Sequence, residues 1–142
     1  MASRSLVSGA IAAVVLLLIS GARVAAQPFP FDQELLLDAE PIRPGKRMPI
    51  LMVEPNGNAK IDLWCRSVPA RVEISGDGIR IEAGALPEDL PAMQGAGQCT
   101  PERIQADEQI LSALSQVTTW RWQDGAIVLA GPTMLKFRSA TN

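Results

Sequence analysis

The sequence contains no histidine and no tyrosine, and only two of its 142 residues are cysteines. Without an imidazole base, Ser-His-Asp and Cys-His nucleophilic systems are excluded. Cys65 and Cys99 are 34 positions apart, so they do not supply the three or four closely spaced ligands of a zinc site. Paired carboxylates are the one catalytic arrangement that the composition leaves open. We therefore expect a protein that is not an enzyme and that has no catalytic residues, metal or cofactor.

The N-terminus has the three parts of a secretory signal peptide. Arg4 precedes an apolar run from Ala10 to Ile19, and the small residues Val24-Ala25-Ala26 follow that run. We expect cleavage after Ala26, which makes residues 1–26 a leader and the protein periplasmic or secreted. The alternative is an uncleaved anchor, because Leu6 to Ala22 reaches the lower limit for a membrane-spanning helix. After cleavage we expect no stable association with the membrane.

The rest of the chain is long enough for one domain and too short for two. Acidic residues outnumber basic ones by 15 to 13, without a basic cluster, so nucleic acid is not an expected partner. We divide the chain into an N-terminal arm with the first strand at 27–47, a main domain at 48–138 and a tail at 139–142. We expect a monomer whose partner, an envelope protein or a small ligand, is unknown.

The two cysteines are predicted to pair with each other. In an oxidising compartment, two cysteines most simply form one disulfide, here Cys65–Cys99. The alternative is a reactive thiol at Cys99, because this residue precedes a predicted helix start whose dipole favours the thiolate. The sequence has no Cys-x-x-Cys motif, and we therefore favour the structural bridge.

Short apolar segments separated by turn residues predict a β-rich fold. Pro55 to Asn58, Gly76 to Gly78 and Asp124-Gly125 have the composition of hairpin turns. Strands are expected at Glu34–Ala39, Arg47–Glu54, Lys60–Cys65, Arg71–Ile74, Ile79–Glu82, Trp120–Trp122, Ala126–Ala130 and Met134–Arg138.

One helix is predicted between the fifth and sixth of these strands. Thr100-Pro101-Glu102 supplies an N-cap, a proline in the first turn and an early acidic residue. An apolar stripe follows. Asp107 lies on the same side of the helix and is an acidic exception to this pattern. The stripe consists of Ile104, Ile110, Leu111, Leu114 and Val117. The predicted fold is α+β: a mostly antiparallel, strongly bent sheet of about seven or eight strands, with one helix packed on it.

The helix and the hairpin after it follow a recognisable residue plan. Ala106 to Leu114 carries a paired-leucine stripe, Val117 to Trp120 forms a polar link, and Met134 to Phe137 is a Leu-x-Phe strand. This plan resembles the C-terminal half of the META domain, the family of the heat-inducible HslJ protein. Cys65 and Cys99 stand where that family has its Gly-Cys-Asn region and its Thr-x-x-x-Cys segment.

The resemblance covers about Met48 to Arg138, and Trp64-Cys65-Arg66 replaces the family's Gly-Cys-Asn. It implies a small β-rich envelope domain with one helix, a role in the heat-shock or stress response, and no accepted catalytic activity. It brings no site residues that could be transferred.

Two predicted strands carry side chains suited to binding. Lys60, Asp62 and Trp64 share one face of their strand, and Trp120 and Trp122 share one side of theirs. Because tryptophan is enriched at binding hot spots, these five residues form a candidate binding surface. The alternative places all three tryptophans in the core, as is common in small β folds.

The leading functional hypothesis is a non-enzymatic envelope domain that binds a ligand or assists stress tolerance. The second hypothesis is an inhibitor of a secreted hydrolase. In that case the long segment from Gly84 to Gln98, which contains three glycines and two prolines, would be the inserted element.

Overall fold

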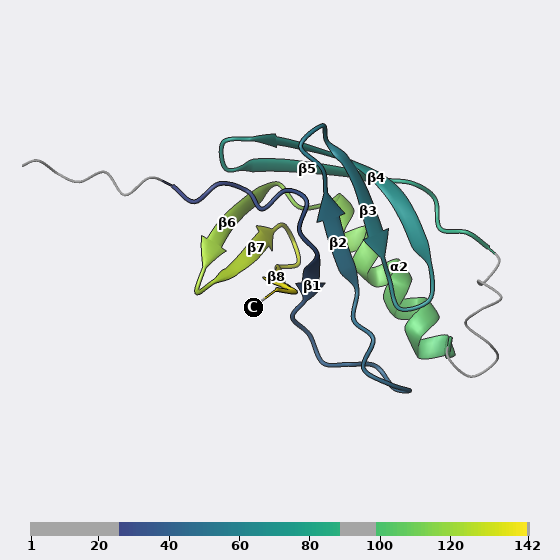
Figure 1. Cartoon of the computed structure of the whole chain (residues 1–142). Helices are drawn as coiled ribbons and strands as arrows, with labels where there is room; N and C mark the ends of the chain where they lie inside the picture. Colours follow the sequence, from purple (N-terminus) through teal and green to yellow (C-terminus); the bar gives the residue numbers. More distant parts are fainter. Residues whose placement is uncertain (1–25, 89–98, 142) are drawn as a thin grey trace, which may run out of the picture.

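The structure is a computed structural model that describes residues 26–88 and 99–141, and its eight antiparallel strands close into a barrel (Figure 1). Strands that follow one another in sequence pair with each other, and β1 pairs with β8. The strands are β1 (Leu35–Leu37), β2 (Ile50–Val53), β3 (Asn58–Asp62), β4 (Ser67–Ser75), β5 (Gly78–Ala83), β6 (Thr119–Gln123), β7 (Ala126–Ala130) and β8 (Leu135–Ser139). The predicted antiparallel, strongly bent sheet is confirmed, and the bend is large enough to close the sheet on itself.

A tight turn at Asp124-Gly125 connects two consecutive strands of the barrel. Asp124 and Gly125 have φ angles of 52° and 73°, and they join β6 and β7 at the Gln123–Ala126 pair. Two consecutive positive φ angles characterise the two-residue hairpin that matches the natural twist of paired strands. The Asp-Gly prediction is therefore confirmed for this hairpin.

The core fills the barrel with side chains from alternate strand positions. Each strand turns every second residue inward, as the two-residue period of a strand requires. The buried inward residues include Leu35, Leu37, Leu51, Val53, Ile61, Val72, Ile79, Ile81, Ile127, Leu129, Leu135 and Phe137.

The N-terminal segment belongs to the same barrel. β1 pairs with β2 on one side and with β8 on the other. Ahead of β1, Phe29 is buried and meets Trp120 edge to face, with the ring centroids 5.3 Å apart. At the other end, β8 continues to Ser139, the first residue of the predicted tail.

Helix α2 (Pro101–Ser115) begins where the sequence predicts. The Thr100 hydroxyl accepts a hydrogen bond from the Arg103 N–H at 3.3 Å, and Pro101 occupies the first turn. In the first half of the helix the buried side chains are Arg103, Ala106 and Asp107, whereas Ile104 of the predicted stripe is half-buried and packs against the core. Within the two described ranges, no helix is long and apolar enough to cross a membrane.

The barrel is narrowly closed between β5 and β6, where Gly78 and Thr119 form the one strand pair. Two backbone hydrogen bonds cross this seam: Ile79 N–H donates to Thr118 O at 3.0 Å, and Trp120 N–H donates to Asp77 O at 2.8 Å. Helix α2 packs against β5 beside the seam. The helix therefore covers the part of β5 that β6 does not reach.

The predicted disulfide is present. Cys65, between β3 and β4, is bonded to Cys99 just before α2, with the two Cα atoms 5.5 Å apart. The bridge thus joins the β3–β4 connection to the start of the helix.

Removing the disulfide is expected to destabilise the barrel. For a loop of 34 residues, the chain-entropy treatment gives a loss of about 3–4 kcal/mol in the free energy of unfolding. The double variant Cys65→Ala with Cys99→Ala, compared with the parent by urea titration, measures this loss. An unchanged unfolding midpoint would show that the bridge adds nothing to stability.

Candidate functional site

The charged pair of the predicted binding surface lies on the outer face of β3. The Lys60 ammonium and the Asp62 carboxylate form an ion pair at 3.1 Å, with the lysine side chain 58% exposed and the aspartate 27% exposed. A pair this open to water contributes little to stability. β3 ends at Asp62, so the strand alternation that was expected to place Trp64 on the same face does not continue that far.

Trp64 lies in the core. Its exposed fraction is 3%, so it does not share a surface with Lys60 and Asp62. Among the described residues, its indole Nε1 is the buried side-chain polar atom that has no hydrogen-bond partner. The physical reason for this placement is a buried carboxylate on the neighbouring helix.

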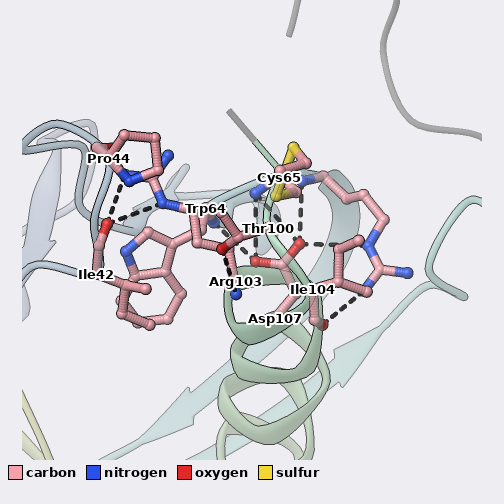
Figure 2. Close-up of a disulfide and its surroundings, with 10 residues drawn as sticks. Ile42, Pro44, Trp64, Cys65, Thr100, Arg103, Ile104 and Asp107 are labelled. Carbon is pink, nitrogen blue, oxygen red and sulfur yellow. Dashed lines mark hydrogen bonds and ion pairs between the residues drawn. A yellow bond between two sulfur atoms is a disulfide. The ribbon is translucent and has the colours of Figure 1, made fainter. Parts of the chain in front are cut away.

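Asp107 holds the connection between β3 and β4 (Figure 2). Its carboxylate accepts hydrogen bonds from the backbone N–H groups of Trp64 at 2.8 Å, Cys65 at 3.2 Å and Arg66 at 3.1 Å. The Arg66 side chain adds a charged contact at 3.2 Å through Nε. Three consecutive N–H groups converging on one carboxylate turn the chain inward, which takes Trp64 into the core.

Arg103, one helical turn earlier, binds a second segment of the chain, the connection between β1 and β2. Its guanidinium donates to the carbonyl of Ile42 at 2.9 Å and also to that of Pro44 (Figure 2). Buried polar groups are tolerated where they are hydrogen-bonded. The first half of α2 therefore buries a polar face, and Asp107, which departs from the predicted apolar stripe, is part of it.

The burial of Asp107 changes its acidity. Its side chain is fully buried, and this desolvation raises the pKa of the carboxyl above its ordinary value of 3.8. The Arg66 side chain and the N–H groups of Cys65 and Trp64 lower the pKa, but their combined effect is smaller.

Trp120 and Trp122 form the aromatic part of the candidate site. Both indoles project from the inner side of β6, pack against the core and remain partly exposed. Trp120 Nε1 donates to the Gly76 carbonyl and Trp122 Nε1 to the Pro28 carbonyl, each at 2.9 Å. Because each ring nitrogen is bonded to backbone, the two rings are held in fixed orientations.

A hollow of about 360 Å³ opens over these indoles. The β4–β5 turn at Gly76 and Asp77 lines one part of it, and Ala26 and Gln27 of the N-terminal segment line another. A second hollow, of about 660 Å³, lies along residues 27–31 and also includes Trp122. Trp122 therefore contributes to both hollows, which share the N-terminal segment.

The site has the composition of a binding surface. No three His, Cys, Asp or Glu side chains in ranges 26–88 and 99–141 are placed to hold a metal ion. Fixed aromatic rings beside a hollow provide apolar contact at low entropic cost, since little side-chain freedom remains to be lost on binding. The arrangement is suited to recognising a ligand.

Sequence reasoning identified the two indoles of β6 but missed their neighbours. Asp77 was seen only as a turn residue, and Gln27 and Phe29 only as parts of an arm. The one available signal was the aromatic and proline content of residues 27–31. Residues 89–98 of the segment expected to insert into a hydrolase lie outside the described residues, as do residues 1–25 of the predicted leader.

Comparison with known proteins supports the fold alone. No protein-family description matches the sequence, and no curated protein matches it. One solved structure, described as "NMR structure of the protein", is similar with a TM-score of 0.53 and 16% sequence identity. The similarity covers 76% of this chain and 89% of that chain.

Replacing the buried carboxylate is expected to weaken the fold. Asp107→Asn replaces one acceptor oxygen with an NH2 donor, so at least one of the three N–H groups loses its acceptor, which should lower the free energy of unfolding by about 1–3 kcal/mol. Asp124→Asn is the matched control, because Asp124 is an exposed turn residue outside this network and its change should fall within about 0.5 kcal/mol. Equal losses in the two variants, measured by chemical denaturation, would rule out the role given to Asp107.

The raised pKa of Asp107 also has a defined effect on stability. The folded state binds the proton more tightly than the unfolded chain, so the group's contribution is fully present below about pH 3.8. That contribution is lost as the pH rises through the folded pKa. A carbon-13 NMR titration of the carboxyl should give a pKa above 3.8. A value below 3.8 would mean that this group's contribution to stability increases with pH instead of decreasing.

Proposed function

We propose that this protein is an exported, non-enzymatic binding domain of the cell envelope, related to the META domain and active in stress tolerance. Its ligand occupies the hollow over Trp120 and Trp122. The observation that carries this proposal is the fixed pair of partly exposed indoles, whose ring nitrogens are both bonded to backbone carbonyls.

Export is supported by the sequence pattern at the N-terminus together with the disulfide. The bond between Cys65 and Cys99 belongs to an oxidising compartment, since cytosolic thiols are kept reduced. Residues 1–26 carry the signal-peptide pattern, and cleavage after Ala26 would leave Gln27 as the first residue, beside the hollow.

A binding role fits the composition better than catalysis does. The chain has no histidine, and the one fully buried carboxylate among the residues that the structure describes, Asp107, is engaged by three backbone N–H groups and Arg66. Among the described residues that line the hollow over the indoles, Asp77 is the one carboxylate, so the described lining does not offer the pair that general acid–base hydrolysis uses.

The test begins with the full chain expressed in its native host. Cell fractionation and an intact mass are expected to show an envelope protein that starts at Gln27 and contains no free thiol. A cytosolic location or a mass that includes Met1 would contradict export and cleavage.

Ligand capture then tests the site. Trp122→Ala, applied as bait to an envelope extract, should retain about tenfold less of the material that the parent captures, which corresponds to about 1.4 kcal/mol. Trp122→Phe should keep part of the binding, because it preserves an aromatic face. Arg80→Ala, on the exposed outer face of β5, should behave like the parent. Equal capture by the parent and Trp122→Ala would place the ligand elsewhere.

A further inference from the structure

β6 has a free edge next to the indole pair. Trp120 N–H points away from β7 and donates to Asp77 O across the seam. Backbone groups in a strand alternate sides with a period of two, so the N–H and C=O of Trp122 point to the same side as those of Trp120. β5 pairs with β6 only at Thr119, and no other strand of the described chain lies beside Trp122 on that side.

This edge opens into the hollow already described. Trp120, Arg121 and Trp122 line the hollow from the side of β6, and Gly76, Asp77 and Gln27 complete the lining that remains once the leader ending at Ala26 is removed. A ligand in this space would therefore meet two apolar rings and one unpaired strand edge. An extended peptide is the ligand class whose backbone can satisfy a strand edge while its side chain fills an apolar hollow.

The charge at the rim selects among peptides. Asp77 is exposed and forms no ion pair with any residue in the described ranges. Arg121 of the same lining keeps its positive charge, but hydrogen bonds to the Gln123 side chain at 3.0 Å and 3.2 Å hold its guanidinium toward the far end of β6 from Asp77. The carboxylate that remains available favours a positively charged side chain on the ligand.

We propose that the protein binds an extended peptide segment of a partner by strand addition to β6 at Trp122. An apolar side chain of that segment enters the hollow over Trp120 and Trp122, and a neighbouring Lys or Arg pairs with Asp77. This inference rests on the proposed function and specifies its ligand class.

The probe is a random twelve-residue peptide library displayed on phage, selected against the exported form of the protein. Enriched peptides should carry an apolar residue next to Lys or Arg. A synthetic copy of the strongest peptide, titrated into nitrogen-15-labelled protein, should shift the amide resonances of Asp77 and Trp122. It should also slow hydrogen exchange at the Trp122 N–H.

Two variants test the contacts separately. Asp77→Asn should weaken the synthetic peptide about tenfold while retaining the backbone bond to Trp120. Asp124→Asn is the matched control, because Asp124 is an exposed turn aspartate at the other end of β6 and asparagine tolerates its positive φ. It should leave the affinity unchanged. Methylating alternate peptide amides should weaken binding only where the amide faces β6.

Several outcomes would overturn strand addition. These are enrichment of no peptide, shifts confined to the outer face of α2, equal affinity of Asp77→Asn and the parent, or a dimer paired through Trp122 without peptide. If envelope capture still depends on Trp122 while no peptide binds, the peptide proposal fails and the binding function stands. If neither envelope capture nor peptide binding depends on Trp122, the proposed binding function and the peptide proposal both fail.

Discussion

The structure depends most on the buried carboxylate of Asp107. Three consecutive N–H groups, from Trp64 to Arg66, converge on this side chain, which has no exposed surface. Any of these N–H groups left without an acceptor in the interior would cost about 1–3 kcal/mol. The disulfide at Cys65 fixes the same connection covalently, so one short segment is attached to the start of α2 in two independent ways.

This attachment at the start of α2 also limits the position of the other end of the helix. Only Gln116 to Thr118 separate the helix from β6, and Val117 is buried in the core. Gly131 leaves no room for adjustment there, because a Cβ at this position would lie 2.6 Å from the Gln116 carbonyl oxygen. With the helix held at its first turns and at its end, the starting point of β6 is set. The two indoles of that strand consequently meet the β4–β5 turn and Phe29 in a defined register.

The parts of the fold that local chemistry controls could be read from the sequence. Asp124-Gly125 requires two positive φ angles, and Thr100-Pro101 satisfies the first N–H groups of a helix, so both predictions hold at the residue level. Trp64 could not be placed in the same way. Its inward turn depends on a carboxylate 43 positions away, and strand alternation placed it on the face of Lys60 and Asp62. The alternative that put the tryptophans in the core is correct for Trp64, but it gave no residue that would turn this side chain inward. The informative signal was Asp107 itself, an acidic residue on an otherwise apolar side, which acts as an internal hydrogen-bond acceptor. For a related reason, the sequence predicted only the Trp120 and Trp122 part of the candidate site. Residues 27–31 reach these two side chains through tertiary contacts, which no local pattern indicates.

The two ends of α2 therefore border regions of opposite character. Near the helix start, charged groups are buried, paired and committed to the fold, so a ligand could not use them without breaking hydrogen bonds. Near β6, the contacts are aromatic and partly open, and the strand edge at Trp122 is short. A long free edge invites aggregation, whereas one that ends within two residues, at Gln123, is limited in how much partner chain it can pair. A peptide added there gains few backbone hydrogen bonds, so most of its affinity must come from the apolar side chain over the indoles. The proposed ligand contacts at Trp120 and Trp122 are thus separate from the Asp107 and Cys65 contacts that attach α2, so binding there would leave that attachment in place.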